Sequence, residues 1–217
     1  MNIINNCTDS KERILDKAEA LFAEKGFHAV TVREITRAAR CNLAAVNYHF
    51  GNKQNLYVEV FKSRWMPRAT RIQECFRHAL SKQDRPSLAG IVHAFAEAFF
   101  KGPVSDDEQL RHSRLMIRET TRTGLGTDMV VDEVIRPFFE ELLALLKPYW
   151  SEKAEREGVI LDIISIFAMV LYFNFARVPV MRLMGKDYDE AFKDRLVEHI
   201  VRFCLSGLNM ERKGRAS

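Results

Sequence analysis

The chain has 217 residues, 47% of them apolar, which is enough to bury one large core or two modest ones. Its net charge of +4 is too small to identify a partner by itself, and its four cysteines form no C-x-x-C pair that would indicate a disulfide framework or a zinc site. The first residues, MNIINN, lack the basic and apolar regions of a secretory signal. We therefore expect a soluble protein of the reducing cytoplasm.

The first predicted element is a helix that begins at a cap, Asp9 or Ser10, and stops at Gly26 in the C′ position. Its apolar stripe comprises Ile14, Ala18, Leu21 and Phe22. We expect this helix to be a scaffold behind the two helices that follow.

The stretch from Thr31 to Leu56 predicts two short helices joined by a tight turn. Apolar residues recur at helical spacing before Arg40 and again from Leu43 to Phe50. Asn42 stands where it can cap the second helix. Helices this short must pack on each other and on a third. The second helix combines small residues with polar and aromatic ones, which is typical of a helix that enters the DNA major groove.

Positive charge is concentrated in the same region. Between Thr31 and Arg64 there are six basic residues and two acidic ones, so this short segment carries a charge equal to that of the whole chain. The basic residues are Arg33, Arg37, Arg40, Lys53, Lys62 and Arg64, and the acidic ones are Glu34 and Glu59. A positive field over one small domain is expected where a phosphate backbone binds.

These residues resemble the DNA-binding domain of the TetR family of bacterial transcriptional regulators. The resemblance rests on the runs ILDKA and LFAEKGF (14–18 and 21–27), TVREI (31–35) and VNYHF (46–50), together with Lys53. It covers roughly a quarter of the chain, by the usual length of that domain. One departure concerns the turn, where the family usually has glycine and this chain has Arg40, which must accept a positive φ or shift the turn.

The resemblance implies an all-α fold and two domains. A three-helix helix-turn-helix DNA-binding domain is expected at residues 1–54, and a larger helical effector-binding and dimerisation domain at residues 55–208. Residues 209–217 are expected to form a flexible basic tail.

The resemblance also places nine residues on the family's DNA-facing positions: Thr31, Arg33, Asn42, Leu43, Ala45, Asn47, Tyr48, His49 and Lys53. Of these, Arg33 and Asn47 suit bidentate contacts to guanine and adenine edges, whereas Thr31, Tyr48, His49 and Lys53 suit the backbone.

Three of these assignments have alternatives. The family's commonest pattern has tyrosine at the position of Asn47, and here the ring follows at Tyr48, so the division between base and phosphate contacts stays open. His49 could equally cap or pack the end of its helix, and Lys53 could be a solvated surface charge. The other histidines do not pair with His49 at ligand spacing, so no metal is predicted.

Beyond this domain the apolar periodicity predicts only helices. Pro67 and Pro137 lie inside helical patterns and should bend them. The predicted helices are one from Lys53 through Leu80 and three more at Leu88–Lys101, Asp106–Thr123 and Asp128–Tyr149.

The last two predicted helices indicate how two subunits associate. Ile160–Ala176 is apolar almost all round but stands at the short edge of the membrane-spanning range, so we expect burial in protein rather than in a membrane. Tyr188–Leu208 carries two apolar rows, one for its own core and one for a partner. We predict a four-helix homodimer interface that contains Phe167, Leu171, Leu196, Ile200, Val201, Cys204 and Leu208.

The resemblance implies a small-molecule effector without identifying it, and no cofactor. Residues that could line its pocket are Phe95, Phe99, Met116, Arg118, Phe138 and Tyr172, although such a stripe is more often plain core. Arg114, Arg118 and Arg122 recur on one helix face, which is either solvated and paired with nearby acids or in contact with an anionic or polar effector.

The expected function is sequence-specific transcriptional regulation, as a repressor that an effector releases from a palindromic operator. A two-fold dimer would place its reading helices about one DNA turn apart, roughly 34 to 36 Å. The alternative is a constitutive or non-specific DNA-binding protein without an effector, which would not need so large an apolar helical domain. An enzyme is not indicated, because the sequence has no G-x-S-x-G, H-E-x-x-H or G-K-[ST] motif.

Overall fold

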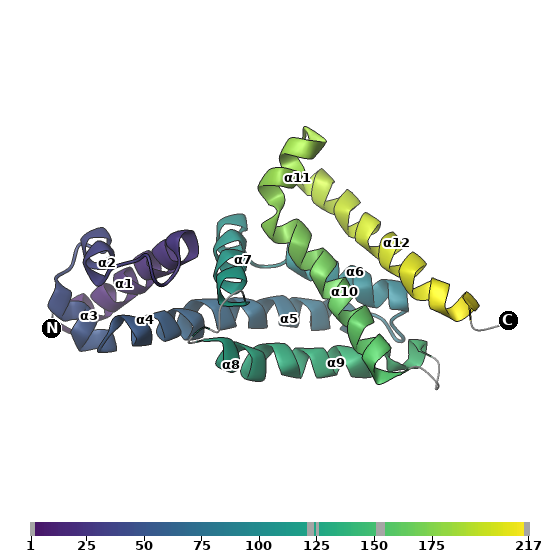
Figure 1. The fold of residues 1–217 in the computed structure, drawn as a ribbon, viewed down its shortest axis with the longest axis horizontal. Helices are drawn as coiled ribbons and strands as arrows, with labels where there is room; N and C mark the ends of the chain where they lie inside the picture. The colour runs from purple at the N-terminus through teal and green to yellow at the C-terminus, as the bar shows by residue number, and fades with distance from the viewer. Residues whose placement is uncertain (1–2, 121–123, 125, 151–154, 215–217) are drawn as a thin grey trace. The chain divides into compact units, whose positions relative to one another are not determined.

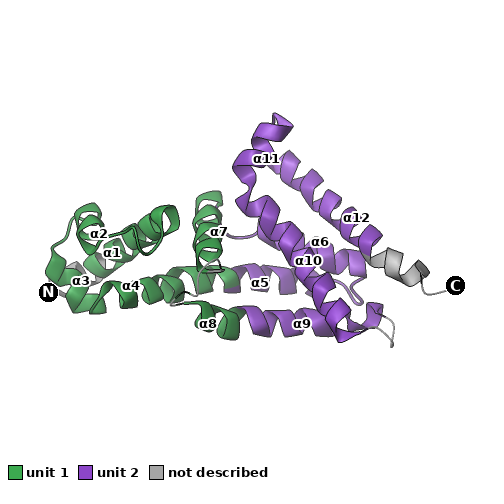
Figure 2. Cartoon of the chain, in the orientation of Figure 1, with its two compact units in different colours: residues 1–69, 106–134 green, residues 70–105, 135–217 purple. Residues whose placement is uncertain are grey.

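The computed structural model describes residues 3–120, 124, 126–150 and 155–214, and their side chains from Ser10 to Gly207 except that of Thr120. Within these residues every regular element is helical, which confirms the all-α prediction (Figure 1). The chain divides into two compact units (Figure 2). Unit 1 comprises Met1–Ala69 and Asp106–Val134, and unit 2 comprises Thr70–Ser105 and Ile135–Ser217.

Unit 1 extends beyond the domain boundary at residue 54 that the sequence predicted. It includes two helices that come later in the chain, and the earlier of these two packs against the first helix. Its elements are α1 (Ile3–Lys25), α2 (Val32–Ala38), α3 (Leu43–Phe50), α4 (Lys53–Val60), the π-helical turn η1 (Phe61–Trp65), the start of α5 (Met66–Ser81), α7 (Asp106–Thr120), α8 (Thr127–Val130) and the π-helical turn η2 (Val131–Ile135) up to Val134.

The first helix differs from its prediction at one end only. It begins at Ile3 rather than at Asp9 or Ser10, because no glycine or proline before Gly26 interrupts it. It ends at Lys25, and Gly26 follows in the C′ position with φ +83° and donates its N–H to the Phe22 carbonyl at 2.9 Å.

The two prolines that were expected to bend helices occupy the same kind of position. Each proline is the second residue of an α-helix that follows a π-helical turn: Pro67 after η1 and Pro137 after η2. At the first junction the N–H of Met66 reaches the carbonyl of Phe61, five residues back. A proline has no N–H to donate, so the helix can widen by one residue at that point instead of continuing its regular ladder.

Unit 2 is built around a core of aromatic and aliphatic side chains. Rings from four parts of the unit meet there, with Phe76 5.5 Å from Phe138 and Phe95 4.7 Å from Phe167 between centroids. Besides the rest of α5, its elements are α6 (Leu88–Phe100), α9 (Arg136–Leu146), the 3-10 turn η3 (Lys147–Tyr149), α10 (Arg156–Phe175), α11 (Arg177–Met184) and α12 (Glu190–Gly214).

Two features of unit 2 differ from the sequence predictions. The short helix α11 was not predicted, because its eight residues include Pro179 and carry no clear apolar stripe. The last helix continues to Gly214 instead of ending at Leu208, so most of the expected flexible tail is helical. The last three residues of the helix predicted at Asp106–Thr123 lie outside the described residues.

Candidate nucleic-acid interface

The turn between α2 and α3 is built as a helix-turn-helix. The Thr31 side chain caps α2 by accepting the Glu34 N–H at 3.2 Å, and the Asn42 side chain caps α3 by accepting the Ala45 N–H at 2.9 Å. Of the two ways in which Arg40 could fit the turn, the structure shows the positive φ, at +52°. The Cys41 N–H then closes the turn by donating to the Thr36 carbonyl at 3.0 Å.

Helix α3 has one buried side and one exposed side. Val46 and Phe50 are buried in unit 1, whereas Leu43 is 46% exposed and Tyr48 79% exposed. This exposed side is therefore available to another surface.

The base-reading candidates lie on exposed positions. Arg33 on α2 and Asn47 on α3 are both exposed, and within the described part of the chain neither side chain has a recorded hydrogen-bond partner. Ala45 is half-buried, and because its side chain is small, a surface that contacts the exposed side of α3 can approach the backbone of this helix. These positions fit the expected roles, which themselves remain predictions.

Two candidates for the phosphate backbone have partners inside unit 1. The Lys53 ammonium donates to the carbonyls of Phe27 and Val30, both at 2.9 Å, and lies 4.3 Å from the centre of the Phe27 ring. His49 Nε2 lies 2.9 Å from the Ser10 hydroxyl on α1. This contact is consistent with the alternative in which His49 packs the end of its helix instead of binding the DNA backbone. Lys53 thus holds the α1–α2 loop, and only one of its three N–H groups is left for a phosphate.

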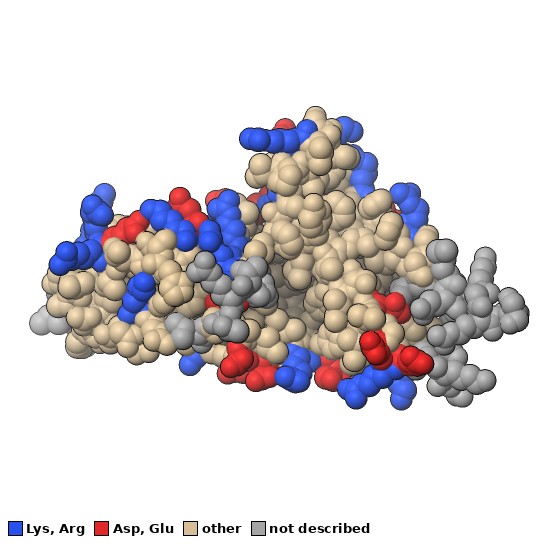
Figure 3. Space-filling model, viewed as in Figure 1, with Lys and Arg blue, Asp and Glu red and all other residues tan. Residues whose placement is uncertain are grey.

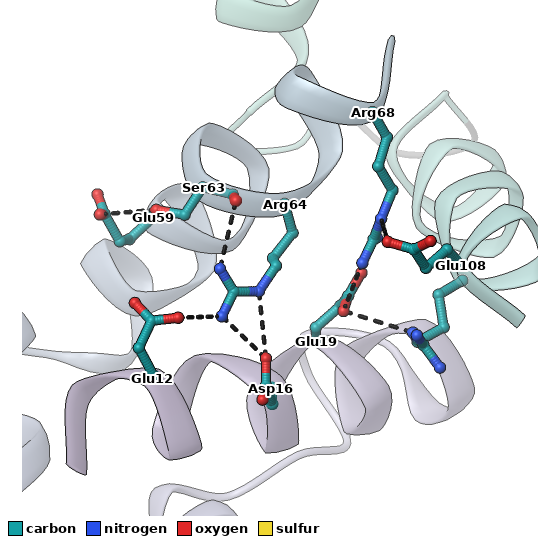
Figure 4. Close-up of polar contacts among 9 residues, drawn as sticks. Glu12, Asp16, Glu19, Glu59, Ser63, Arg64, Arg68 and Glu108 are labelled. Atoms are coloured by element: carbon teal, nitrogen blue, oxygen red, sulfur yellow. Dashed lines mark hydrogen bonds and ion pairs between the residues drawn. The ribbon is translucent and has the colours of Figure 1, made fainter. Parts of the chain in front are cut away.

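The basic residues of this region divide into exposed and paired ones. Arg33, Arg37, Arg40 and Lys62 are exposed. Arg64 instead binds Glu12 at 2.6 Å and Asp16 at 2.8 Å on α1 (Figure 4). Figure 3 shows Lys and Arg side chains on the visible face of unit 1. Within the described residues the exposed arginines of α2 and the turn form no ion pair, so they keep the predicted positive field at this surface.

A buried ion-pair cluster joins α1, α5 and α7 within unit 1. Glu19 and Arg68 are 3% and 4% exposed and form a two-point ion pair, and Glu108 of α7 lies 3.3 Å from the other side of Arg68 (Figure 4). Arg111 of α7 approaches Glu19 at 3.4 Å. Glu19 and Arg68 are buried, whereas Glu108 and Arg111 are 29% and 35% exposed, so breaking the Glu19–Arg68 pair would leave an uncompensated buried charge.

Two further contacts hold α7 to the DNA-binding helices. Arg118 donates to the Ala23 carbonyl at 3.1 Å and to the Glu24 carbonyl, at the end of α1 where a helix favours positive charge. The Tyr57 hydroxyl donates to Glu119 at 2.7 Å, and burial together with this bond raises the pKa of Tyr57. The bonds of Arg118 to α1 and of Glu119 to Tyr57 could not be predicted from the sequence, since periodicity does not indicate which helix a distant arginine or glutamate will reach.

The six residues suggested for an effector pocket are not gathered in one unit. Phe95, Phe99 and Phe138 belong to the aromatic core of unit 2, where Tyr172 is 54% exposed. Met116 and Arg118 belong to unit 1, and Arg118 is engaged as described above. Arg114 is exposed, and Arg122 lies outside the described residues.

Within the described residues, the core of unit 2 contains a small apolar cavity. Its volume is about 10 Å³, roughly the space of one water molecule. It is lined by Ile91, Val92, Phe95, Leu142, Leu146, Ile163, Ile166 and Phe167. This cavity is too small for an effector, and the assignment of these rings to an effector pocket stays a prediction.

The predicted dimer residues lie mostly in the core of their own subunit. Leu196, Ile200 and Cys204 are at most 7% exposed, and Phe167 and Val201 pack against the same core. Leu171 is half-buried, and the side chain of Leu208 is outside the described residues. For the buried row of α12 the assignment to a partner is therefore wrong. Spacing alone could not tell which of two adjacent apolar rows faces inward.

The exposed apolar side chains lie elsewhere on the same helices. They are Leu161, Ile164, Tyr172 and Phe175 on α10 and Phe203 on α12. By length and composition, helix α10 could cross a membrane. One such helix is weak evidence for a membrane span, because the core helix of a soluble protein can have the same length and composition. The expected burial of this segment in protein holds on one side only, because just 22% of its apolar window is buried.

No group of three or more His, Cys, Asp or Glu side chains that could hold a metal ion occurs among the residues described here.

Two family models match the chain. Residues 14–60 match "Bacterial regulatory proteins, tetR family", and residues 87–208 match the C-terminal domain of the "HTH-type transcriptional dual regulator CecR". The second match alone spans more than half of the chain.

Individual relatives agree with these models. The biofilm operon negative transcriptional regulator IcaR of Staphylococcus epidermidis is 36% identical over 194 residues, which cover 86% of this chain and 94% of the relative. The dual regulator CecR of Shigella flexneri is 24% identical over 199 residues, which cover 88% and 87%.

Two solved structures have the same fold. One is the hemolysin II transcriptional regulator HlyIIR, with a TM-score of 0.60 and 21% identity over 89% of this chain and 97% of that one. The other is the regulator FadR from Bacillus subtilis in complex with stearoyl-CoA, with a TM-score of 0.60 and 18% identity over 88% and 97%. Taken with the helix-turn-helix geometry, the comparisons show that the chain belongs to the TetR family of DNA-binding transcriptional regulators, which are not enzymes, and has a CecR-like C-terminal domain.

Proposed function

We propose that the protein is a cytoplasmic repressor that binds a palindromic operator as a homodimer and is released by a small-molecule effector. The observation that carries the proposal is the division of α3, which buries Val46 and Phe50 and turns Asn47 and Tyr48 outward. The names of two relatives, one a negative regulator and one the repressor AcnR of Corynebacterium glutamicum, support repression.

Dimerisation is supported by the apolar side of α10. Its exposed side chains Leu161, Ile164, Tyr172 and Phe175 follow one another mostly at helical spacing, and Phe203 adds a ring from α12. A second copy related by a two-fold axis would cover this side with the same side, as the commonest soluble oligomers do. We assign the interface to these residues in place of the buried row of α12.

An effector is supported by the relative whose structure holds stearoyl-CoA and by the bonding of α7 within unit 1. A ligand that shifts α7 would also shift α1, because Arg118 and the Glu19 cluster join the two helices. In our hypothesis the effector favours a state in which the two reading helices lose the separation that one DNA turn requires.

Footprinting on the promoter beside the protein's own gene tests the proposal. A specific dimer protects one palindrome whose half-sites are about 34 to 36 Å apart, and it keeps that preference over competitor DNA as the salt concentration rises. Uniform protection that disappears for all sequences together would identify a non-specific binder and reject the proposal.

A further inference from the structure

One side of α7 carries buried polar atoms that lack partners. Gln109 is 3% exposed and His112 is 5% exposed. Within the described residues, neither the amide nitrogen nor the amide oxygen of Gln109 makes a hydrogen bond, and neither does Nδ1 of His112. Residues three apart lie on the same side of a helix, so these atoms belong to one small region. Buried polar groups without partners are rare in folded proteins, and each requires an explanation.

The imidazole is held in a fixed orientation. Its ring stacks on Trp65 with a centroid distance of 4.4 Å and an angle of 7° between the planes, and the Trp65 indole N–H donates to the His112 carbonyl at 3.2 Å. Trp65 is the last residue of the π-helical turn η1, and such turns occur frequently at functional sites. The region is therefore ordered before any ligand binds.

The surroundings favour an uncharged ligand. Burial, and to a lesser extent Arg68, lower the pKa of His112 to about 3, so the imidazole is neutral at physiological pH. The charges nearby on α1, α5 and α7 lie beside opposite charges: Glu19 binds Arg68 and lies 3.4 Å from Arg111, and Glu108 lies 3.3 Å from Arg68. Nε of Arg111 is also buried without a hydrogen bond within the described residues, so the region contains one unsatisfied cationic donor. Because the Arg111 charge already lies beside Glu19, a charged ligand would lose its hydration here and gain little from that group.

We propose that Gln109 and His112 recognise an uncharged effector, with Trp65 fixing the orientation of His112. The effector would carry a group that has a hydrogen-bond donor and an acceptor side by side, such as a carboxamide or a lactam. The primary amide of Gln109 presents a donor and an acceptor that match this group. The inference rests on the proposed effector response. It adds the class of effector and the residues that select it.

Tryptophan fluorescence tests the inference directly. Trp65 and Trp150 are the two tryptophans of the chain, so the Trp150→Phe protein reports on Trp65 alone. The probes are benzamide, its charged counterpart benzoate and its apolar counterpart toluene. We expect benzamide to change the emission with saturation, and benzoate and toluene to bind at least about tenfold more weakly, a difference of about 1.4 kcal/mol. Equal binding of the three probes, or no response to benzamide, overturns the inference.

A matched pair of variants separates recognition from structure. Gln109→Leu in the Trp150→Phe protein should abolish the benzamide response and raise the melting temperature, because it replaces unpartnered polar atoms with an apolar side chain of similar size. Tyr57→Phe is the control, since it removes a hydroxyl that has a partner and should lower the melting temperature. If Gln109 only holds a structural water, Gln109→Leu lowers the melting temperature and benzamide binds regardless of the residue, which also overturns the inference.

Operator footprinting is measured separately on the wild-type protein and on the Trp150→Phe protein. Loss of a specific footprint in the wild-type protein would reject the proposed function. A normal footprint together with a failed benzamide experiment would reject only the ligand assignment.

Discussion

The interactions that stabilise unit 1 internally differ in kind from those that stabilise unit 2. Unit 1 has an apolar core, with Phe22 and Phe61 fully buried, but its helices are also joined by directional polar contacts. These are the buried Glu19–Arg68 pair, the buried Tyr57–Glu119 bond and the more exposed bonds of Arg118 to the end of α1. In unit 2 the core consists of packed rings and aliphatic chains, and an apolar side of α10 is left exposed. Directional bonds fix the angle between helices, whereas apolar packing tolerates rearrangement. The difference suits a unit that holds a reading helix in place and a unit to which we assign the dimer interface.

The buried ion pair provides the largest predicted effect. Arg68→Ala leaves the Glu19 carboxylate buried without its partner, and we expect a loss of about 3 to 5 kcal/mol in the free energy of unfolding. Urea denaturation followed by circular dichroism measures it. The double variant Glu19→Leu with Arg68→Met is the control, because an apolar pair of similar volume should restore much of the loss. A cost of Arg68→Ala below about 1 kcal/mol would contradict a structural role for the pair.

Tyr57→Phe should cost about 1.5 to 3 kcal/mol, since it removes a buried hydrogen bond to a charged group. The change also predicts a pH dependence. The pKa of Tyr57 is raised in the folded protein above its ordinary value of 10. The folded state therefore keeps the hydroxyl protonated, and the stability that this contributes is present below pH 10 and is lost as the pH rises further. Urea midpoints compared from pH 8 to about 11 should fall more steeply for the wild-type protein than for Tyr57→Phe. Parallel curves would show that the hydroxyl is not buried against Glu119.

On the DNA-binding surface, Asn47→Ala should relax the preference at one base position by about 1 to 3 kcal/mol with little change in stability. Competition binding with single-base operator variants measures it. Arg37→Ala is the control, because removing an exposed positive charge should weaken binding to all sequences alike. Lys53→Ala is a poorer control, since Lys53 also holds the carbonyls of Phe27 and Val30. An unchanged base preference in Asn47→Ala would assign readout to another residue of α3.

The smallest predicted change in subunit stability comes from the exposed side of unit 2. Ile164→Glu alters a residue that is 48% exposed, so the free energy of unfolding of the subunit should change by no more than about 0.5 kcal/mol. The dimer should nevertheless dissociate in analytical ultracentrifugation, because a charge would be buried at the interface. Ile200→Glu is the contrasting variant, as Ile200 is fully buried and its replacement should unfold unit 2. A stable dimer of Ile164→Glu would place the interface elsewhere.

The local features of the DNA-binding region could be predicted from sequence. The end of α1 before Gly26, the Asn42 cap and the positive φ of Arg40 each depend on a few neighbouring residues. The partners of Lys53, Arg64 and Arg118 could not, because each reaches a group 23 to 95 positions away in the chain. Lys53 was assigned to a phosphate, and Arg64 was counted in the positive field, because their charge was visible in the sequence while their partners were not.

The sequence by itself determined the helical class, the position of the reading helix and the family, because periodicity, capping residues and short motifs act over a few residues. Only the tertiary structure decided that α7 belongs with the DNA-binding helices, that the Ile200 row of α12 faces its own core, and that Gln109 and His112 are buried without partners. These outcomes depend on which surfaces meet after the helices have formed. An apolar row or a charged side chain has the same sequence pattern whichever neighbour it finds.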